Sequence, residues 1–542
     1  MPYKQQQGKP RVILFSDGRH AAGLDCFEPP ITKTDHGIIA NEVSNSGIDA
    51  IVHFSAGEGG TVLYNSKVAQ RWGAVTKKWD HYVWSRTAHA LNQLINDGHD
   101  PLEVLCKSCH DKDLLFIASG WVSIHGGTRK QHEGLGRWSA FALDNPEFQV
   151  GFDPDPRANT VIKTRFSFLY PEVRRERLLI FQEMLSKYET DGIELNLTSE
   201  IPYCRFDQVH QLAPLMTQWI RDLRQIAAKS EKLQGRRKQI YARIPAHSKA
   251  WELAGYEIQT WVSENLVDGL FCESSFTEDD GIDQDVDLTD IVNITRKTNC
   301  SVFYSLHTNL YRQFHRSAPQ AAIWAGAANA YDQGVDGIAI ADHLWTPNGW
   351  PWTPQEYETV RLLGNPQLLA TAKKHYLVRS EVQDTTGLRW LPGRSYQLPK
   401  VLLENESAEI SFRVSDDLNH WNGLNRIKAV ILRIRFGGII INYDKVQVKL
   451  NRQLLPDFIL KKVDMTYRLV DQASSSHSIT PYGYAYDYYL NRNNYPKHGR
   501  NYLIVTLLKR DPNIAQKFSI DRVECRIEYQ LHRHYKEEPL QY

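Results

Sequence analysis

The sequence predicts an α/β protein: a closed (β/α)₈ barrel, the TIM-barrel fold, followed by an antiparallel β-sandwich of the jelly-roll kind. Eight short runs of apolar and β-branched residues are each followed by a helical stretch, which is typical of βαβ units on a parallel sheet. Beyond residue 380, strand-like runs follow one another without intervening helices. The eight runs are Arg11–Ser16, Ile48–Ser55, Leu114–Ser119, Gly192–Leu197, Gln239–Ile244, Val267–Cys272, Ser301–Leu306 and Val335–Ala341.

Three of these runs begin with nearly identical turns, in which an Asp-Gly pair stands at Asp191, Asp268 and Asp336. We expect the glycine to end the preceding helix in the left-handed conformation. An open, doubly wound sheet is the competing topology. The closed barrel is favoured because eight units occupy residues 11 to about 345 and no Gly-x-Gly-x-x-Gly follows the first run.

The change of pattern predicts two domains, a barrel over residues 1–379 and a β-sandwich over residues 380–542. We expect the last barrel helix to run to about Tyr376. The runs AEISFRVS, AVILRIRF, KVQVKLN, YLIVTLLKR and VECRIEY alternate as strands of a sandwich do. The Tyr/Asn-rich segment 474–501 reads as a long loop.

Composition excludes several classes of partner. The 64 Lys+Arg balance 63 Asp+Glu, so no net charge attracts nucleic acid or an anionic membrane. No run of eighteen apolar residues predicts a membrane span. The chain as it stands suggests a cytoplasmic protein, whereas removal of a signal peptide would make it secreted or periplasmic. The 14 Trp and 26 Tyr suit surfaces that are half apolar and half wet, such as sugars.

Barrel enzymes build their sites at the C-terminal ends of the strands, so polar residues at these ends are the candidates. Glu194 is the most informative, because a carboxylate within a buried strand is costly unless it lines a polar cavity. The alternative is a structural ion pair with Arg243. Asn196 lies two residues further on and faces the same side as Glu194.

Glu273, at the end of the sixth run, supplies a second carboxylate, and a pair of carboxylates is what glycoside hydrolysis requires. Asp342 is the substitute for it, and Glu273 can also be read as an ordinary loop residue. Three tryptophans after the eighth run can stack on a pyranose or form a hydrophobic lid. They are Trp345, Trp350 and Trp352. The remaining candidates for contacts with sugar hydroxyls are Asp17, Trp121, His125 and His307.

Other chemistries find little support. The motif Cys106-Lys107-Ser108-Cys109-His110 matches the haem-attachment pattern, but its context is a helix with a core-facing stripe. No metal-ligand set such as HExxH occurs, so we expect neither a metal nor a cofactor. Lysine is absent from the inner strand ends, which weakens a Schiff-base mechanism.

Several stretches resemble barrel proteins of the glycoside hydrolase superfamily, in particular the glycosidase-10-like group of bacterial proteins. These are TVLYNSKVAQRWG, YPEVRRERLLIFQEMLSKYETDGIELNL and VDGLFCE, with LNRQLLP in the accessory sandwich. The fourth-strand motif of that group reads Asp-Gly-Ile-Glu-Leu-Asp, which implies that Glu194 is the catalytic acid. This chain has Asn196 in place of the final Asp. If that Asp is the nucleophile or base of the group, this chain is impaired or altered.

The working hypothesis is a glycosidase in which Glu194 is the general acid/base and Glu273 the nucleophile or base. Asn196, Arg243, His307 and Asp342 would then orient sugar hydroxyls. One alternative is a catalytically decayed barrel that only binds carbohydrate. Another is a lyase or isomerase acting on a sugar acid.

Overall fold

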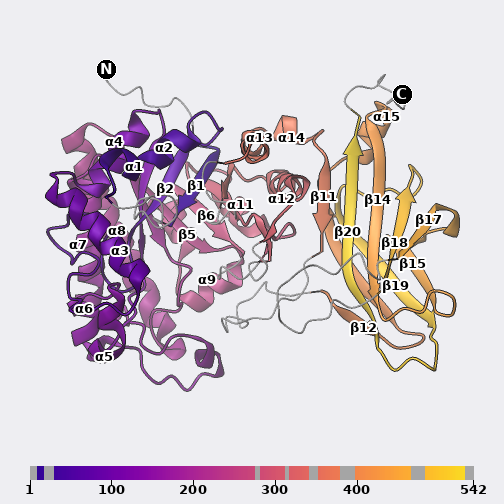
Figure 1. Ribbon diagram of the computed structural model, residues 1–542, viewed down its shortest axis with the longest axis horizontal. Helices are drawn as coiled ribbons and strands as arrows, with labels where there is room; N and C mark the ends of the chain where they lie inside the picture. Colours follow the sequence, from indigo (N-terminus) through magenta and orange to yellow (C-terminus); the bar gives the residue numbers. More distant parts are fainter. Residues whose placement is uncertain are drawn as a thin grey trace.

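The computed structural model contains two assemblies of strands joined through a layer of helices (Figure 1). A barrel surrounded by helices is built from the N-terminal part of the chain, and two antiparallel sheets are built from the C-terminal part. The structure describes residues 9–17, 30–274, 281–311, 316–340, 352–378, 397–464 and 483–530.

The predicted barrel is confirmed. Eight parallel strands close on themselves in the order β1-β10-β7-β6-β5-β4-β3-β2. Each of the eight predicted runs overlaps one strand of the barrel. The strands are β1 (Val12–Ser16), β2 (Ala50–Ala56), β3 (Leu115–Trp121), β4 (Gly192–Asn196), β5 (Gln239–Pro245), β6 (Gly269–Glu273), β7 (Ser301–Leu306) and β10 (Gly337–Ile340). A short hairpin of β8 (Asn309–Tyr311) and β9 (Arg316–Ser317) follows β7.

Helices surround the barrel, and most of them contribute to one large hydrophobic core. They are α1 (Lys33–His36), α2 (Ile38–Val43), α3 (Tyr82–Asn96), α4 (Pro101–His110), α5 (Arg129–His132), α6 (Ala140–Asp144), α7 (Pro171–Ser186), α8 (Val209–Gln234), α9 (Ser248–Ala254), α10 (Ile258–Ser263), α11 (Thr289–Thr295), α12 (Gln320–Asp332), α13 (Pro354–Leu363) and α14 (Pro366–Leu369). In α4 the cysteines of the haem-like motif are buried, as the expected core-facing stripe requires.

The Asp-Gly turns fasten each of three strands to the neighbouring strand. The carboxylates of Asp191, Asp268 and Asp336 each accept a hydrogen bond of 2.8 Å from a backbone N–H of that strand. The expectation about the glycines was wrong, because none of the three is left-handed. Glycine is needed there for space: a Cβ on Gly192 would lie 2.2 Å from the carbonyl oxygen of Gln239.

The C-terminal part is a two-sheet antiparallel β-sandwich, as predicted. One sheet has the order β11-β20-β14-β18-β17, with β12 also paired to β20, and the other has the order β13-β19-β15-β16. The strands are β11 (Lys374–Leu377), β12 (Lys400–Leu402), β13 (Ser407–Val414), β14 (Ile427–Gly437), β15 (Lys445–Leu450), β16 (Gln453–Leu454), β17 (Leu460–Asp464), β18 (Gly483–Leu490), β19 (Gly499–Lys509) and β20 (Phe518–Tyr529). A short helix, α15 (Leu418–Gly423), follows β13.

Two expectations about this part were wrong. The last barrel helix does not reach Tyr376: α14 ends at Leu369, and residues 374–377 form β11, which pairs with β20 of the sandwich. Part of the expected loop 474–501 is also regular, since β18 covers 483–490 and β19 starts at Gly499. Tyrosine favours strands, and Tyr486 and Tyr488 are buried between the sheets. Residues 474–482 lie outside the described residues.

The space argument for Gly192 can be tested by mutation. Gly192→Ala is expected to destabilise the protein by about 2–3 kcal/mol, because the added Cβ forces β4 away from β5. Gly423→Ala is the matched control, since a Cβ there meets no atom within 4 Å. The free energies of unfolding in urea would be compared. Equal stability of the two variants would contradict the close strand approach.

Candidate active site

The lower half of the barrel interior is filled by an apolar cluster, which forms a floor for anything bound above it. The cluster comprises Ile13, Phe15, Ala50, Val52, Leu115, Ile117, Tyr241, Phe271, Phe303 and Ala339. Side chains two residues further along a strand point to the same face. The next inward positions on β3, β5, β6 and β7 are therefore Ser119, Arg243, Glu273 and Ser305. We call the C-terminal ends of the barrel strands the rim.

Glu194 lies at this level on β4 and is completely buried. Its register neighbours are Ser119 on β3 and Tyr241 on β5. The Ser119 hydroxyl donates a short hydrogen bond to Oε2, and Nε of Arg243 donates to Oε1 at 2.8 Å. The guanidinium carbon of Arg243 also lies 3.7 Å from the centroid of the Phe15 ring, at the top of the apolar floor. The ion pair considered as the alternative for Glu194 is thus present.

Opposing influences act on the acidity of Glu194. Burial raises its pKa, whereas the charge of Arg243 and the hydrogen bonds from Ser119 and Arg243 lower it. The charge of Glu273 raises the pKa further, and the balance is a raised pKa. The protonated carboxyl is therefore favoured relative to a glutamate in water.

Glu273 ends β6 and is 4% exposed. Its Oε1 lies 2.6 Å from Nε2 of His307, which follows β7 directly and is also buried. Ser305, the register neighbour of Glu273 on β7, is fully buried, and its hydroxyl has no partner among the described residues. Glu273, His307 and Ser305 thus form a polar group on two adjacent strands.

Asn196 occupies the last position of β4, beside Trp121 and Arg243 in register. Its Oδ1 accepts hydrogen bonds from the Thr198 backbone N–H at 3.2 Å and from the Thr198 hydroxyl at 3.0 Å. These contacts fix the amide and direct its Nδ2 away from Thr198.

Trp121 and His125 lie together beyond β3. Their ring centroids are 5.8 Å apart in an edge-to-face arrangement, and Trp121 is half-buried. His125 is buried, and burial lowers its pKa. Its Nε2 has no hydrogen-bond partner among the described residues. Trp121 is therefore partly accessible to a ligand at the β3 side of the rim, whereas His125 is covered.

The remaining predicted residues lie in different surroundings. Asp17 is half-buried directly after β1, two residues beyond Phe15. Trp352 is 5% exposed and packs in the core, with its ring centroid 5.5 Å from that of Tyr357. It therefore serves core packing and offers too little surface to stack on a sugar. Asp342, Trp345 and Trp350 lie outside the described residues.

Two site residues were missed from the sequence, Ser119 and Ser305. Serine in a strand carries no distinctive pattern, and only the register shows that these residues face inward beside the carboxylates. The available signal is their spacing, two residues beyond the apolar floor residues Ile117 and Phe303.

In the described part of the chain, no group of three or more His, Cys, Asp or Glu side chains is placed to hold a metal ion. A search of the same residues finds no helix that is both long enough and apolar enough to cross a membrane.

No protein-family profile and no curated protein matches the chain. Solved structures that resemble it include a cycloisomaltooligosaccharide glucanotransferase from a Paenibacillus species (11% identity, 95% of this chain, 57% of the other, TM-score 0.33). Two α-L-fucosidases also resemble it. Isoenzyme 2 of Paenibacillus thiaminolyticus has 11% identity over 67% of this chain and 50% of the other, with a TM-score of 0.41. The enzyme from a Vibrio species has 10% identity over 95% of this chain and 96% of the other, with a TM-score of 0.34. The chain spans about half the length of the two Paenibacillus proteins. Likeness this distant carries no information about the chemistry of the site.

The raised pKa of Glu194 predicts a pH dependence of stability. A carboxyl group whose pKa is higher in the folded than in the unfolded chain binds its proton more tightly when folded. Stability is therefore lost as pH rises from the unfolded value near 4.5 to the raised folded value. We expect Glu194→Gln to abolish this loss. Raising the pH from 4 to 7 should therefore raise the melting temperature of the variant relative to that of the wild type. Glu409→Gln, at an exposed position, is the matched control and should leave the difference constant. A constant difference for Glu194→Gln would contradict the raised pKa.

Proposed function

We propose that the protein is a glycoside hydrolase that cleaves an O-glycosidic bond in an oligosaccharide or polysaccharide. One observation carries the proposal: two buried carboxyl groups, Glu194 within β4 and Glu273 at the end of β6, face the barrel interior. Buried carboxylates are costly to keep in a barrel interior. Two carboxyl groups in different environments are what acid/base cleavage of a glycoside requires.

In the proposed mechanism Glu194 is the general acid. Its raised pKa favours the protonated carboxyl group that a general acid needs, and that proton passes to the glycosidic oxygen as the bond to the anomeric carbon breaks. The nearby Arg243 stabilises the carboxylate that remains. Glu194 can then take a proton back from water, which returns the site to its starting state.

Glu273 acts on the anomeric carbon or on the attacking water. Nε2 of His307, 2.6 Å from Oε1, orients the carboxylate and compensates its charge when the imidazole donates. As a nucleophile, Glu273 forms a glycosyl ester that water later hydrolyses; as a base, it takes a proton from the water that attacks. The leaving sugar gains the proton of Glu194 in both cases.

Hydroxyl recognition is assigned to the polar groups around the two carboxylates. Nδ2 of Asn196 and the Ser305 hydroxyl suit this role, since Asn196 lies two residues beyond Glu194 on β4 and Ser305 is the register neighbour of Glu273. Arg243, His307 and His125 contribute donors, and Asp342 completes the expected set from outside the described residues. Sugars are rich in paired donors and acceptors, which such a set can match.

A carbohydrate-binding protein without turnover is the second candidate. It is favoured by the contact of Arg243 with Glu194, because an ion pair inside the barrel stabilises the fold without any reaction. In this case the barrel would bind the same saccharides and leave their glycosidic bonds intact.

The leaving group of the substrate distinguishes the roles of the two carboxylates. With natural oligosaccharides, Glu194→Gln is expected to lower kcat by about 10²–10⁴-fold, because the leaving sugar alcohol needs a proton. With aryl glycosides whose phenol leaves unprotonated, such as 2,4-dinitrophenyl glycosides, the loss in bond cleavage should be much smaller. Glu273→Gln should lose activity on both substrate classes.

Melting curves of the same proteins would show whether they fold. Equal losses on both substrate classes for Glu194→Gln would remove it as the acid. A folded wild type that binds saccharides but hydrolyses none across a panel of glycosides and polysaccharides would support the binding protein instead.

Asn196→Asp separates an intact site from a decayed one. If Glu194 and Glu273 are the catalytic pair, the substitution removes an amide donor and buries a third carboxylate, so hydrolysis should fall by roughly tenfold, equivalent to one hydrogen bond. Asn196→Ala should show a similar loss and serves as the control. Activity that appears only in the Asp variant would indicate that the natural chain has lost its catalytic carboxylate.

A further inference from the structure

A cavity of about 250 Å³ lies where the barrel meets the sandwich, apart from the rim. Its walls come from α12 and the segment around α14 on the barrel side, and from β11, the turn after β13 and α15 on the sandwich side. The lining residues are Ala328, Tyr331, Asp332, Pro366, Ala370, Lys374, Ser415, Asp416 and Trp421. Asp332 ends α12, and a helix that ends before a barrel strand ends at the face opposite the rim.

Aromatic rings form part of both walls. Tyr331 belongs to the barrel and lines the cavity, and its hydroxyl donates to the carbonyl of Leu363 at 2.7 Å. Trp421 belongs to the sandwich and is half-buried, with its ring 6.2 Å from that of Tyr529 in an edge-to-face arrangement. The ring of His420 lies 4.9 Å from that of Trp421, and Trp421 itself lines the cavity.

The polar floor of the cavity is rigid. Asp416 is 4% exposed and accepts short hydrogen bonds from the hydroxyls of Tyr376 and Tyr529. Nζ of Lys374 lies 3.5 Å from Asp416 and donates to the carbonyls of Leu369 and Ala372. The buried lysine thereby compensates the charge of the buried aspartate.

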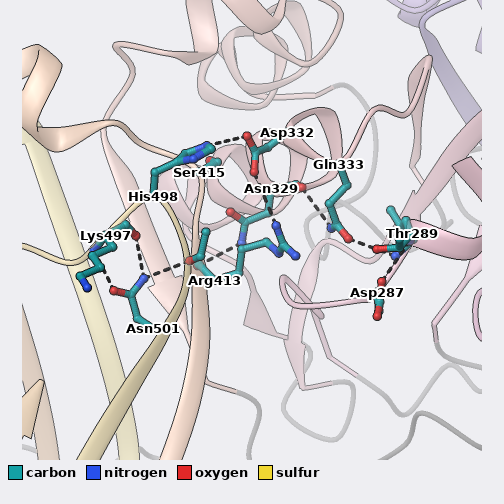
Figure 2. A network of polar contacts seen from close by, with 12 residues as sticks. Asp287, Thr289, Asn329, Asp332, Gln333, Arg413, Ser415, Lys497, His498 and Asn501 are labelled. Carbon is teal, nitrogen blue, oxygen red and sulfur yellow. Dashed lines mark hydrogen bonds and ion pairs between the residues drawn. The ribbon is translucent and has the colours of Figure 1, made fainter. Parts of the chain in front are cut away.

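The second carboxylate, Asp332, is compensated as well. Nε2 of His498 lies 2.7 Å from Oδ1, and a guanidinium nitrogen of Arg413 lies 3.6 Å from Oδ2 (Figure 2). Both partners come from the sandwich, so these contacts cross the junction. Asn329 adds a hydrogen bond of 3.2 Å to the carbonyl of Arg413. The two walls of the cavity are therefore held in place before any ligand arrives.

We propose that this cavity is a second carbohydrate site, which binds one neutral pyranose unit with its ring against Trp421. An indole face, a tyrosine ring and two carboxylates match the C–H face and the hydroxyls of a sugar. Since both carboxylates already have cationic partners, a charged ligand finds no uncompensated group. The cavity is smaller than the roughly 300–1,000 Å³ of pockets for drug-sized ligands, which suits a single ring.

This site is independent of turnover at the rim, so its test does not depend on hydrolysis. The full-length chain would be labelled with 5-fluorotryptophan, and the fluorine resonance of Trp421 would be assigned from its absence in Trp421→Phe. Glucose, galactose, mannose, xylose, fucose and N-acetylglucosamine would be added at millimolar concentration. At least one of them is expected to shift the Trp421 resonance saturably. The resonance of Trp121 reports separately on sugar bound at the rim.

A blocking variant tests the cavity without touching the tryptophan. Ala370→Phe fills the space and should keep the Trp421 resonance while abolishing its shift. Tyr489→Ala, an exposed aromatic position of the sandwich, is the control and should leave the shift unchanged. The proposal is overturned if none of the six sugars shifts the Trp421 resonance, or if the shift survives in Ala370→Phe. Glucosamine and glucuronate would be added as charged counterparts, and a shift produced only by one of these two would overturn the neutral ligand.

Discussion

The upper half of the barrel depends on the buried ion pair between Glu194 and Arg243. Glu194 is completely buried and the side chain of Arg243 is 15% exposed, so loss of Arg243 would leave the Glu194 carboxylate uncompensated in the protein interior. Arg243 also covers Phe15 at the top of the apolar floor. The pair therefore joins the packed lower interior to the polar rim.

The same pair sets the chemistry available to the site. Burial and Arg243 act on the Glu194 proton in opposite directions, and the outcome is a carboxyl that holds its proton more tightly than usual. Glu273 has a histidine partner and lies nearer the open end of its strand. Two carboxyl groups in unlike environments can divide the roles of acid and nucleophile, which two identical environments would not allow. The ion pair is thus compatible with a catalytic as well as a structural role.

The strands of the barrel could be predicted because each is a short, continuous apolar run, and the Asp-Gly turns mark where three of them start. Features that depend on residues distant in sequence could not be predicted. β11 becomes a strand because β20 pairs with it about 150 residues later. Gly337 must lack a side chain because the carbonyl of Arg11 lies against it. Ser119 and Ser305 look ordinary in the sequence, and only strand register places them beside Glu194 and Glu273.

Helix α12 explains why the sandwich stays at one place on the barrel. The helix is rich in alanine, and its small side chains let sheets approach from both sides: Ala322 and Ala327 pack in the barrel core, whereas Ala325 packs in the sandwich core. A helix buried on two faces needs both partners, because removal of the sandwich would expose an apolar surface to water. The ion pairs of Asp332 at the end of α12 then fix the orientation that this packing permits. The sandwich is for this reason a structural component of the barrel wall, and the cavity beside Tyr331 exists only while the two parts are joined.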